Sequence, residues 1–223
     1  MTQLTLDLGV RPAYGSEDFI VAESNRAAVA WIDGWPDWPS YGLAVTGPPG
    51  SGKTHLCQVW RQRAGARVID PAALGALAPP ELVGDAPAIV LDGLGAPGEP
   101  LPERPLLHLL NHLAEQGRHV LIAAREPPAR WTVGLADLQS RLAALPAVAI
   151  GAPDDGLLGA VIRKLFRDRQ LQVGREVVDY LLARMERSLS AAQSTVAALD
   201  GAALAGGRPI TVALARAVLV DTA

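Results

Sequence analysis

Eight consecutive residues, Gly47 to Thr54 (Gly-Pro-Pro-Gly-Ser-Gly-Lys-Thr), have the composition and spacing of a loop that binds phosphate. They match G-x-x-x-x-G-K-[ST], the Walker A pattern, at every fixed position. Glycines let the backbone curl so that N–H groups point at phosphate oxygens, and Lys53 adds a cation. The hydroxyl of Thr54 is a ligand for Mg²⁺. The motif predicts a nucleoside phosphate held by Pro49, Gly50, Ser51, Gly52, Lys53, Thr54 and His55.

The flanking residues predict the elements that such a loop needs. An apolar run at 43–46 is typical of a buried strand, and residues 54–63 have the pattern of a helix. A helix that begins at the loop directs its free amides and the positive end of its dipole at the phosphates. The alternative is a glycine- and proline-rich turn that carries Lys-Thr by chance, and the flanking strand and helix argue against it.

The rest of the chain predicts an α/β fold followed by a helical unit. Apolar runs alternate with helical patterns, which indicates a parallel sheet covered by helices on both faces. From Pro153 onward only helical patterns occur. The predicted division is an extended peptide at 1–12, an α/β base at 13–152 and a small helical lid at 153–223. Further strands are expected at 67–69, 88–92, 119–124 and 148–150, and helices at 25–32, 106–116, 154–169, 175–185, 191–204 and 211–220. Ser24 is expected to be the N-cap of the first of these helices.

Composition narrows the class of protein. The 223 residues carry a net charge of −3, without a block of Lys and Arg, which argues against a surface built for direct, sequence-specific DNA binding. No run approaches the roughly 20 apolar residues that span a bilayer, and the N-terminus has no signal peptide. One cysteine excludes an internal disulfide. We expect a cytoplasmic protein without a membrane partner.

A second phosphate-site feature lies about 35 residues after the first. The apolar run 88–91 ends in Asp92, a carboxylate suited to holding the Mg²⁺ of a bound nucleotide. The next residue is Gly93. P-loop ATPases with this pair of motifs usually carry Glu or Asp at this position, and its carboxylate orients the attacking water. A positioned base contributes about 10²–10⁴ in rate. The sequence therefore predicts nucleotide binding with weak or no intrinsic hydrolysis.

Two further segments resemble the DnaA replication-initiator branch of the AAA+ proteins. They are Asp18-Phe19-Ile20-Val21-Ala22-Glu23-Ser24-Asn25-Arg26 and Gly134-Leu135-Ala136-Asp137-Leu138-Gln139-Ser140-Arg141-Leu142, and the resemblance extends from about residue 14 onward. It implies an AAA+ fold in which Phe19 and Ile20 pack against the adenine. It also implies that Arg141 is an arginine finger acting on a neighbouring subunit's nucleotide. The alternative for Arg141 is a surface pair with Asp137, four residues earlier on the same helix.

The first residues of the sequence indicate which DnaA-related family the chain resembles. The run Gln3-Leu4-Thr5-Leu6-Asp7-Leu8 is similar to the peptide that binds the bacterial sliding clamp. DnaA proteins also continue past the lid into a DNA-binding domain, whereas this sequence ends at Ala223. The combination resembles the Hda family of DnaA regulators. It implies two partners, DnaA and the DNA polymerase III sliding clamp, the latter held by Gln3, Leu4, Leu6 and Leu8. Without the resemblance, the peptide reads as an edge strand or a frayed terminus.

Other family positions are altered. The end of the 119–124 strand, where a polar sensor is expected, has Ala123 and Ala124 before Arg125. The lid arginine that contacts nucleotide in the family would fall at Ser190, and Arg187, one turn earlier, is its candidate substitute or a solvated surface residue. These changes imply that ADP or ATP, with Mg²⁺, is held as a structural cofactor.

The sequence thus predicts a nucleotide-bound regulator of replication initiation that stimulates ATP hydrolysis by DnaA in trans. The principal alternative is an AAA+ ATPase that acts on DNA as a helicase loader does, which needs a base such as Glu99 or Asp85. A small-molecule kinase is a third, less supported alternative. The resident nucleotide, and whether the free protein is a monomer or a head-to-tail dimer, stay open.

Overall fold

The computed structural model describes residues 19–95, 98 and 100–221. The predicted clamp-binding residues Gln3, Leu4, Leu6 and Leu8 lie outside this part of the chain. The α/β part contains β1 (Gly42–Thr46), β2 (Arg67–Ile69), β3 (Ala88–Asp92), β4 (His119–Ala124), β5 (Ala147–Ala149), α1 (Arg26–Asp33), α2 (Lys53–Ala64), α3 (Pro79–Val83), α4 (Glu103–Glu115) and α5 (Ala136–Ala144). The C-terminal part contains α6 (Asp155–Asp168), α7 (Arg175–Leu182), α8 (Leu189–Gly206) and α9 (Val212–Asp221).

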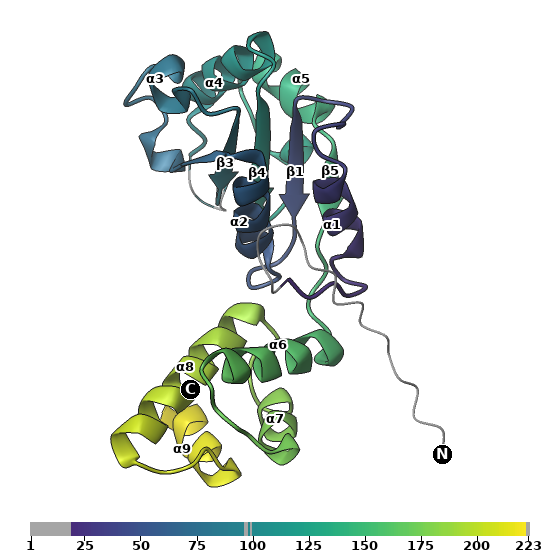
Figure 1. Ribbon diagram of the computed structural model, residues 1–223. Helices are drawn as coiled ribbons and strands as arrows, with labels where there is room; N and C mark the ends of the chain where they lie inside the picture. Colours follow the sequence, from purple (N-terminus) through teal and green to yellow (C-terminus); the bar gives the residue numbers. More distant parts are fainter. Residues whose placement is uncertain (1–18, 96–97, 99, 222–223) are drawn as a thin grey trace.

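The five strands form one parallel sheet in the order β2-β3-β4-β1-β5. All five residues of β1 are buried, which explains why the central strands are continuous apolar runs without a polar face. Parallel strands bring all their carboxyl ends to one edge. In Figure 1 the strand arrows point along that shared direction, towards the C-terminal helices.

Helices cover both faces of the sheet, as predicted. Alternate side chains of the strands enter two separate cores. The first core joins the sheet to α1 and α2 and contains the fully buried ring of Trp60. The second joins it to α3, α4 and α5 and contains four buried leucines of α4. The short helix α3 was not predicted from the sequence.

Helices α6 to α9 form the predicted lid around a core of their own (Figure 1). Three of them begin at side-chain caps: Asp154 accepts the Leu157 N–H at 2.7 Å, the Ser188 hydroxyl accepts the Ala191 N–H at 3.1 Å, and the Thr211 hydroxyl accepts the Leu214 N–H at 3.3 Å. Such caps are worth about 1 kcal/mol each. Residues 150–154 connect β5 to α6, so the predicted boundary at 152/153 falls in this connection. The division of the chain into these units stays a prediction.

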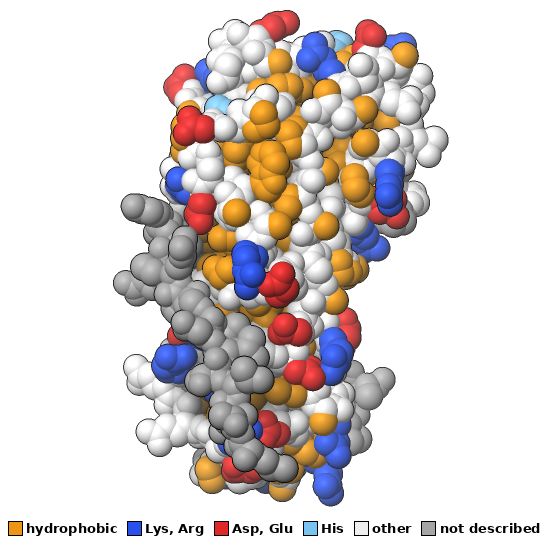
Figure 2. Space-filling view, turned by 90° about the vertical axis from the view of Figure 1, so that its right-hand side faces the viewer, with side chains coloured by type: hydrophobic (Ala, Val, Ile, Leu, Met, Phe, Trp, Pro, Cys, Tyr) orange, Lys and Arg blue, Asp and Glu red, His pale blue; other side chains and the backbone are white. Residues whose placement is uncertain are grey.

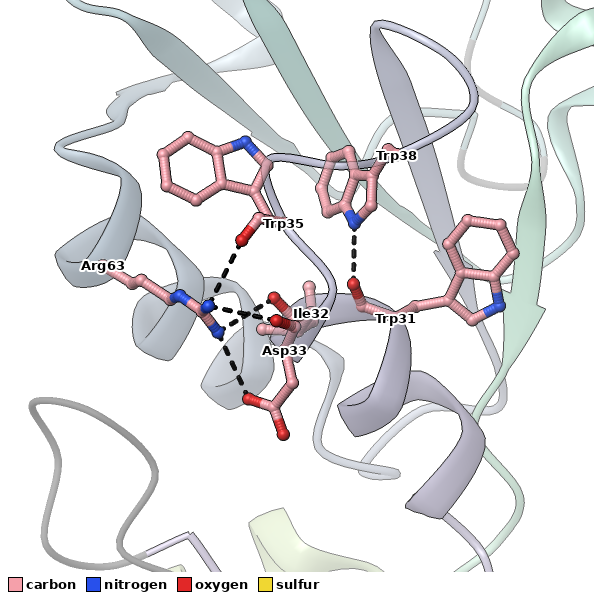
Figure 3. A network of polar contacts seen from close by, with 6 residues as sticks. All are labelled: Trp31, Ile32, Asp33, Trp35, Trp38 and Arg63. Atoms are coloured by element: carbon pink, nitrogen blue, oxygen red, sulfur yellow. Dashed lines mark hydrogen bonds and ion pairs between the residues drawn. The ribbon is translucent and has the colours of Figure 1, made fainter.

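A tryptophan cluster and Arg63 fix α1 against α2 (Figure 3). The ring of Trp38 stacks on Trp60 with 5.3 Å between centroids, and its Nε1 donates to the Trp31 carbonyl at 2.6 Å. The Arg63 guanidinium donates to the carbonyls of residues 32, 33 and 35 and to the Asp33 carboxylate, at 3.0 to 3.3 Å. Because these acceptors include the free carbonyls at the end of α1, Arg63 caps that helix from α2.

The face that carries the edge strand β5 is shown in Figure 2. Hydrophobic side chains gather over its upper half, and Lys and Arg are interspersed with Asp and Glu. Among the described side chains of this face there is no continuous basic band of the kind that follows a nucleic-acid backbone. In the part of the chain that the structure covers, no helix is long and apolar enough to cross a membrane.

Candidate nucleotide site

A cavity of about 550 Å³ lies between the α/β base and the lid. The base contributes the phosphate loop and the segment that precedes α1, and the lid contributes α6 and the start of α8. Apolar side chains form much of the wall, as in most sites for small molecules. Its lining residues are Phe19, Ile20, Asn25, Gly50, Ser51, Gly52, Lys53, Thr54, His55, Gln58, Leu157, Val161, Lys164, Leu165, Leu189, Ser190 and Gln193.

The phosphate loop joins the carboxyl end of β1 to α2 and has the curled backbone that its sequence predicts. Gly50 and Gly52 have φ angles of 68° and 102°, a region in which side-chain-bearing residues are strained. Gly50 is also where the lid contacts the loop, because its carbonyl accepts the Leu189 N–H at 2.8 Å. A Cβ built on Gly50 would lie 2.3 Å from the Cβ of Ser188. Loop and lid therefore touch at a position where only a glycine fits.

The start of α2 suits an anion. Its N-terminal cap is Gly52, and no side-chain hydrogen bond caps the helix. The Ser51 hydroxyl is buried in the loop and has no hydrogen-bond partner among the described residues. A helix N-terminus without a side-chain cap, with a buried hydroxyl beside it, fits the oxygens of a phosphate group.

Lys53 interacts electrostatically with the other charged groups near the phosphate loop. Its ammonium donates to the carbonyls of Gly47 and Pro48, both at 2.8 Å. Burial lowers the pKa of Lys53; the nearby Asp92 carboxylate partly offsets this, and the Arg125 guanidinium lowers the pKa further. These shifts place Asp92 and Arg125 within electrostatic reach of the phosphate loop. Arg125, to which no role was assigned from the sequence, directly follows the residue of β4 paired with Thr46 of β1.

The segment before α1 is held in place by Asn25 and not by Ser24, which the helical pattern had suggested as the N-cap. The Asn25 side chain accepts the Ala22 N–H at 2.8 Å and donates to the Ile20 carbonyl at 3.0 Å. This clamp places Phe19 and Ile20 in the cavity wall, where the ring of Phe19 lies 5.2 Å from that of His55. The sequence singled out Phe19, Ile20 and His55 but missed Asn25, whose partners lie in a turn that only the structure shows.

The predicted magnesium ligands come from neighbouring elements. Thr54 lines the cavity, and Asp92 ends β3, two strands from β1. A hydroxyl, a carboxylate and the phosphates themselves form an oxygen donor set that suits Mg²⁺. The described residues contain no cluster of three His, Cys, Asp or Glu side chains able to hold a metal by themselves. A metal held jointly with phosphate oxygens is the kind of site that these residues fit.

The structure also locates the predicted positions for a base. Gly93 has no side chain, so no carboxylate comes from this position; its φ is 83°, and a Cβ added there would meet nothing within 4 Å. Asp85 precedes β3 and thus lies at the amino end of that strand, opposite the phosphate loop. It cannot act on a nucleotide in this cavity. Glu99 lies outside the described residues.

Arg141 lies away from the cavity. It sits in the last turn of α5, beside Tyr41 at the start of β1, which is the edge of the sheet opposite the phosphate loop. Burial raises the pKa of Tyr41, and the neighbouring guanidinium partly offsets that rise. The Tyr41 hydroxyl reaches no hydrogen-bond geometry with any described group. No ion pair joins the described side chains of Arg141 and Asp137, which was the sequence alternative for this arginine.

The helix that carries Arg141 is fixed at its start by Glu103 of α4. Both carboxylate oxygens of Glu103 accept backbone N–H groups at 2.8 Å, from Gly134 and Leu135. A doubly bonded carboxylate at a helix N-terminus is a favourable charge-assisted arrangement. The segment that resembles the DnaA family is thereby tied to the core of the base.

Two predicted nucleotide-contact residues are not among those that line the cavity. The Arg187 guanidinium pairs with the Asp155 carboxylate at 2.8 Å on the lid surface. Ser190, the position at which the family carries an arginine, does line the cavity. Pro49 is the second predicted nucleotide-contact residue that does not line the cavity. Lys164 is the cationic lid residue that does line the cavity. It was not predicted from the sequence because it belongs to no recognisable motif.

Comparisons with known proteins find similarity to DnaA proteins and to the lid of Hda. The family model described as "Hda, lid domain" matches residues 159–219. The chromosomal replication initiator protein DnaA of Clavibacter sepedonicus is 24% identical over 238 residues, covering 96% of this chain and 50% of that protein. The chain therefore spans about half the length of the curated relatives it matches.

Solved structures show the same fold. Domain III of the Thermotoga maritima replication initiation protein DnaA superposes with a TM-score of 0.77 at 19% identity, covering 95% of this chain and 98% of that domain. The AMPPCP-bound DnaA of Aquifex aeolicus superposes with a TM-score of 0.65 at 22% identity, covering 86% of this chain and 66% of that one. The fold predicted from the sequence, a P-loop base with a C-terminal helical lid, is confirmed.

Proposed function

Because this chain is a DnaA-related AAA+ protein with a lid of the Hda type, we propose that it is a nucleotide-bound regulator of replication initiation. The observation that carries the proposal is the cavity in which a complete phosphate loop meets that lid. The cavity takes ADP or ATP, with the phosphates at the loop and the start of α2, and the adenine against Phe19 and Ile20. Mg²⁺ is held by Thr54 and Asp92 and neutralises phosphate charge.

Two features support binding without rapid turnover. Gly93 supplies no base, and Asp85 lies at the wrong edge of the sheet. A bound nucleotide instead stabilises the contact between loop and lid at Gly50 and Leu189. Any nucleotide contact from Arg187 first requires its pair with Asp155 to open. The nucleotide is in this proposal a structural cofactor.

The second part of the proposal concerns Arg141. Its position at the opposite edge from its own phosphate loop suits a residue that acts on another subunit's nucleotide. We expect it to reach the ATP of DnaA, where an arginine stabilises charge that develops on the γ-phosphate. Such fingers contribute about 10³–10⁵ in rate in other systems. The chain is then an activator of hydrolysis by DnaA.

The third part is the sliding clamp. Gln3, Leu4, Leu6 and Leu8 form a short peptide that suits an apolar groove flanked by hydrogen-bond acceptors. Binding to DNA-loaded clamp raises the local concentration of the regulator where DnaA has to be inactivated. The double variant Gln3→Ala with Leu4→Ala should lose clamp binding in a surface-immobilised clamp assay, whereas Thr5→Ala should keep it. Equal binding by all three proteins would remove the clamp from the proposal.

The decisive experiment measures phosphate release from ATP-loaded DnaA of the same organism in the presence of DNA-loaded clamp. The wild-type chain should accelerate release, Arg141→Ala and Arg141→Lys should not, and Arg130→Ala, which removes an exposed arginine from the neighbouring turn, should behave as wild type. Nucleotide binding by each variant is measured alongside. No acceleration by the wild type, or full acceleration by Arg141→Ala, would refute the finger. Substantial hydrolysis by the chain alone would favour the helicase-loader-like ATPase instead.

A further inference from the structure

Both lysines of this chain line the same cavity. All other Lys and Arg positions in the sequence are arginines, yet Lys53 lies on the base side of the cavity and Lys164 on the lid side. Lys53 belongs to the phosphate loop. Lys164 belongs to no motif, and the proposed function assigns it no role.

Lys164 is placed in the wall by the periodicity of α6. Residues 157, 161, 164 and 165 of this helix share one face and all line the cavity. Only 17% of the Lys164 side chain is exposed, and its ammonium pairs with Asp168, whose side chain is 44% exposed. The other three residues of this face, at 157, 161 and 165, are apolar side chains of the same cavity wall. In such surroundings a charged contact is stronger than it is in water.

The distribution of charge in the cavity indicates which ligand group the Lys164 ammonium binds. A nucleoside diphosphate or triphosphate brings several negative charges, and among the described residues of the base that line the cavity, Lys53 is the only Lys or Arg. Of the described lid residues that line the cavity, Lys164 is the only one that carries a charge; Ser190 and Gln193 are polar but neutral. Arg187 is held on the lid surface by Asp155.

We infer that Lys164 binds the phosphates of the nucleotide from the lid, exchanging its pair with the more exposed Asp168 for the ligand. The inference rests on the proposed nucleotide binding. The lid then senses phosphate through α6 as well as through the contact of Leu189 with Gly50, and closure of the lid depends on the ligand's charge. An ammonium suits this exchange because it is a point charge without a fixed donor geometry.

The test compares ADP with adenosine by isothermal titration calorimetry. Lys164→Met keeps the apolar stem and removes the charge, so ADP should bind roughly 10-fold to 100-fold more weakly while adenosine binds as it does to wild type. Arg163→Met is the matched control, because it removes one exposed positive charge from the neighbouring position of the same helix. It should leave the affinity for ADP unchanged.

Asp168→Asn separates a ligand contact from a structural ion pair. If Lys164 binds phosphate, removing its competing carboxylate should tighten ADP binding several-fold, opposite to the effect of Lys164→Met. If the pair merely stabilises the lid, both variants should weaken ADP binding together, and the inference is overturned. Asp168→Asn retains the lysine, so it remains decisive even if Lys164→Met fails to fold.

Two further outcomes are informative. A parallel loss of ADP and adenosine binding in Lys164→Met overturns the phosphate contact, because adenosine has no phosphate. Failure of the wild-type protein to bind ADP would instead refute the proposed nucleotide binding itself. Wild-type affinity is therefore measured first, and the two failures are distinguishable.

Discussion

Substitution of Gly50 by alanine should separate the lid from the phosphate loop. Gly50 has a φ of 68°, and an alanine Cβ would lie 2.3 Å from the Cβ of Ser188. The obstructing atom is the first side-chain carbon of the residue that caps α8, so it cannot rotate away. The main chain of either the loop or the lid has to move.

The expected loss in the free energy of unfolding has two parts, which a control variant can separate. The left-handed conformation costs an alanine about 1–2 kcal/mol, and overpacking of a close contact typically costs about 1–3 kcal/mol. Gly93→Ala has the first cost without the second, because Gly93 has a φ of 83° and nothing within 4 Å of the added Cβ. We therefore expect Gly50→Ala to lower the free energy of unfolding by about 2–5 kcal/mol and Gly93→Ala to lower it by about 1–2 kcal/mol.

Thermal unfolding followed by tryptophan fluorescence measures the difference. For a chain of this size 1 kcal/mol corresponds to roughly 2–4 °C in Tm, so the two variants should differ by several degrees. The tryptophans report on the base, because Trp35, Trp38 and Trp60 lie in and against its first core. Equal Tm values for Gly50→Ala and Gly93→Ala would refute the contact between Gly50 and Ser188 as the source of the cost.

Three other substitutions have outcomes fixed by single features of the structure. Arg63→Lys should lower the free energy of unfolding by about 1–3 kcal/mol in denaturant titrations, because one ammonium cannot serve the acceptors that the guanidinium spans; Arg61→Lys, on the exposed side of α2, should change it little. Burial lowers the pKa of His119, so the unfolded chain binds the proton more tightly and stability should fall as the pH drops below about 6.5. His119→Gln should flatten that part of the pH profile, and an unchanged slope would assign it to other groups. Gly201→Ala, at an exposed position inside α8 with open space around it, should raise the free energy of unfolding by about 1 kcal/mol, and any loss of stability would contradict the helix geometry there.

Local sequence patterns predicted much of the fold. The strands β2, β3 and β4 have the bounds expected from the sequence. For β3 and β4 the reason is that a strand buried on both faces needs apolar residues throughout. The phosphate loop was equally predictable from the sequence, because its chemistry depends on residue types at fixed spacing within one turn. The start of α1 was predicted wrongly at Ser24. Asn25 was preferred because its side chain bonds to the turn at 20–22, which periodicity does not reveal.

The sequence by itself determined that this protein has a phosphate loop, a parallel sheet and a helical lid, because each is encoded by neighbouring residues. Only the tertiary structure decided which distant groups share the cavity. It brought Lys164 and Ser190 to the wall, paired Arg187 with Asp155 away from it, and placed Arg125 within electrostatic reach of Lys53. The physical reason is that these positions depend on how the lid packs on the base and on the order of strands in the sheet. Both are long-range contacts, which no local period or spacing records.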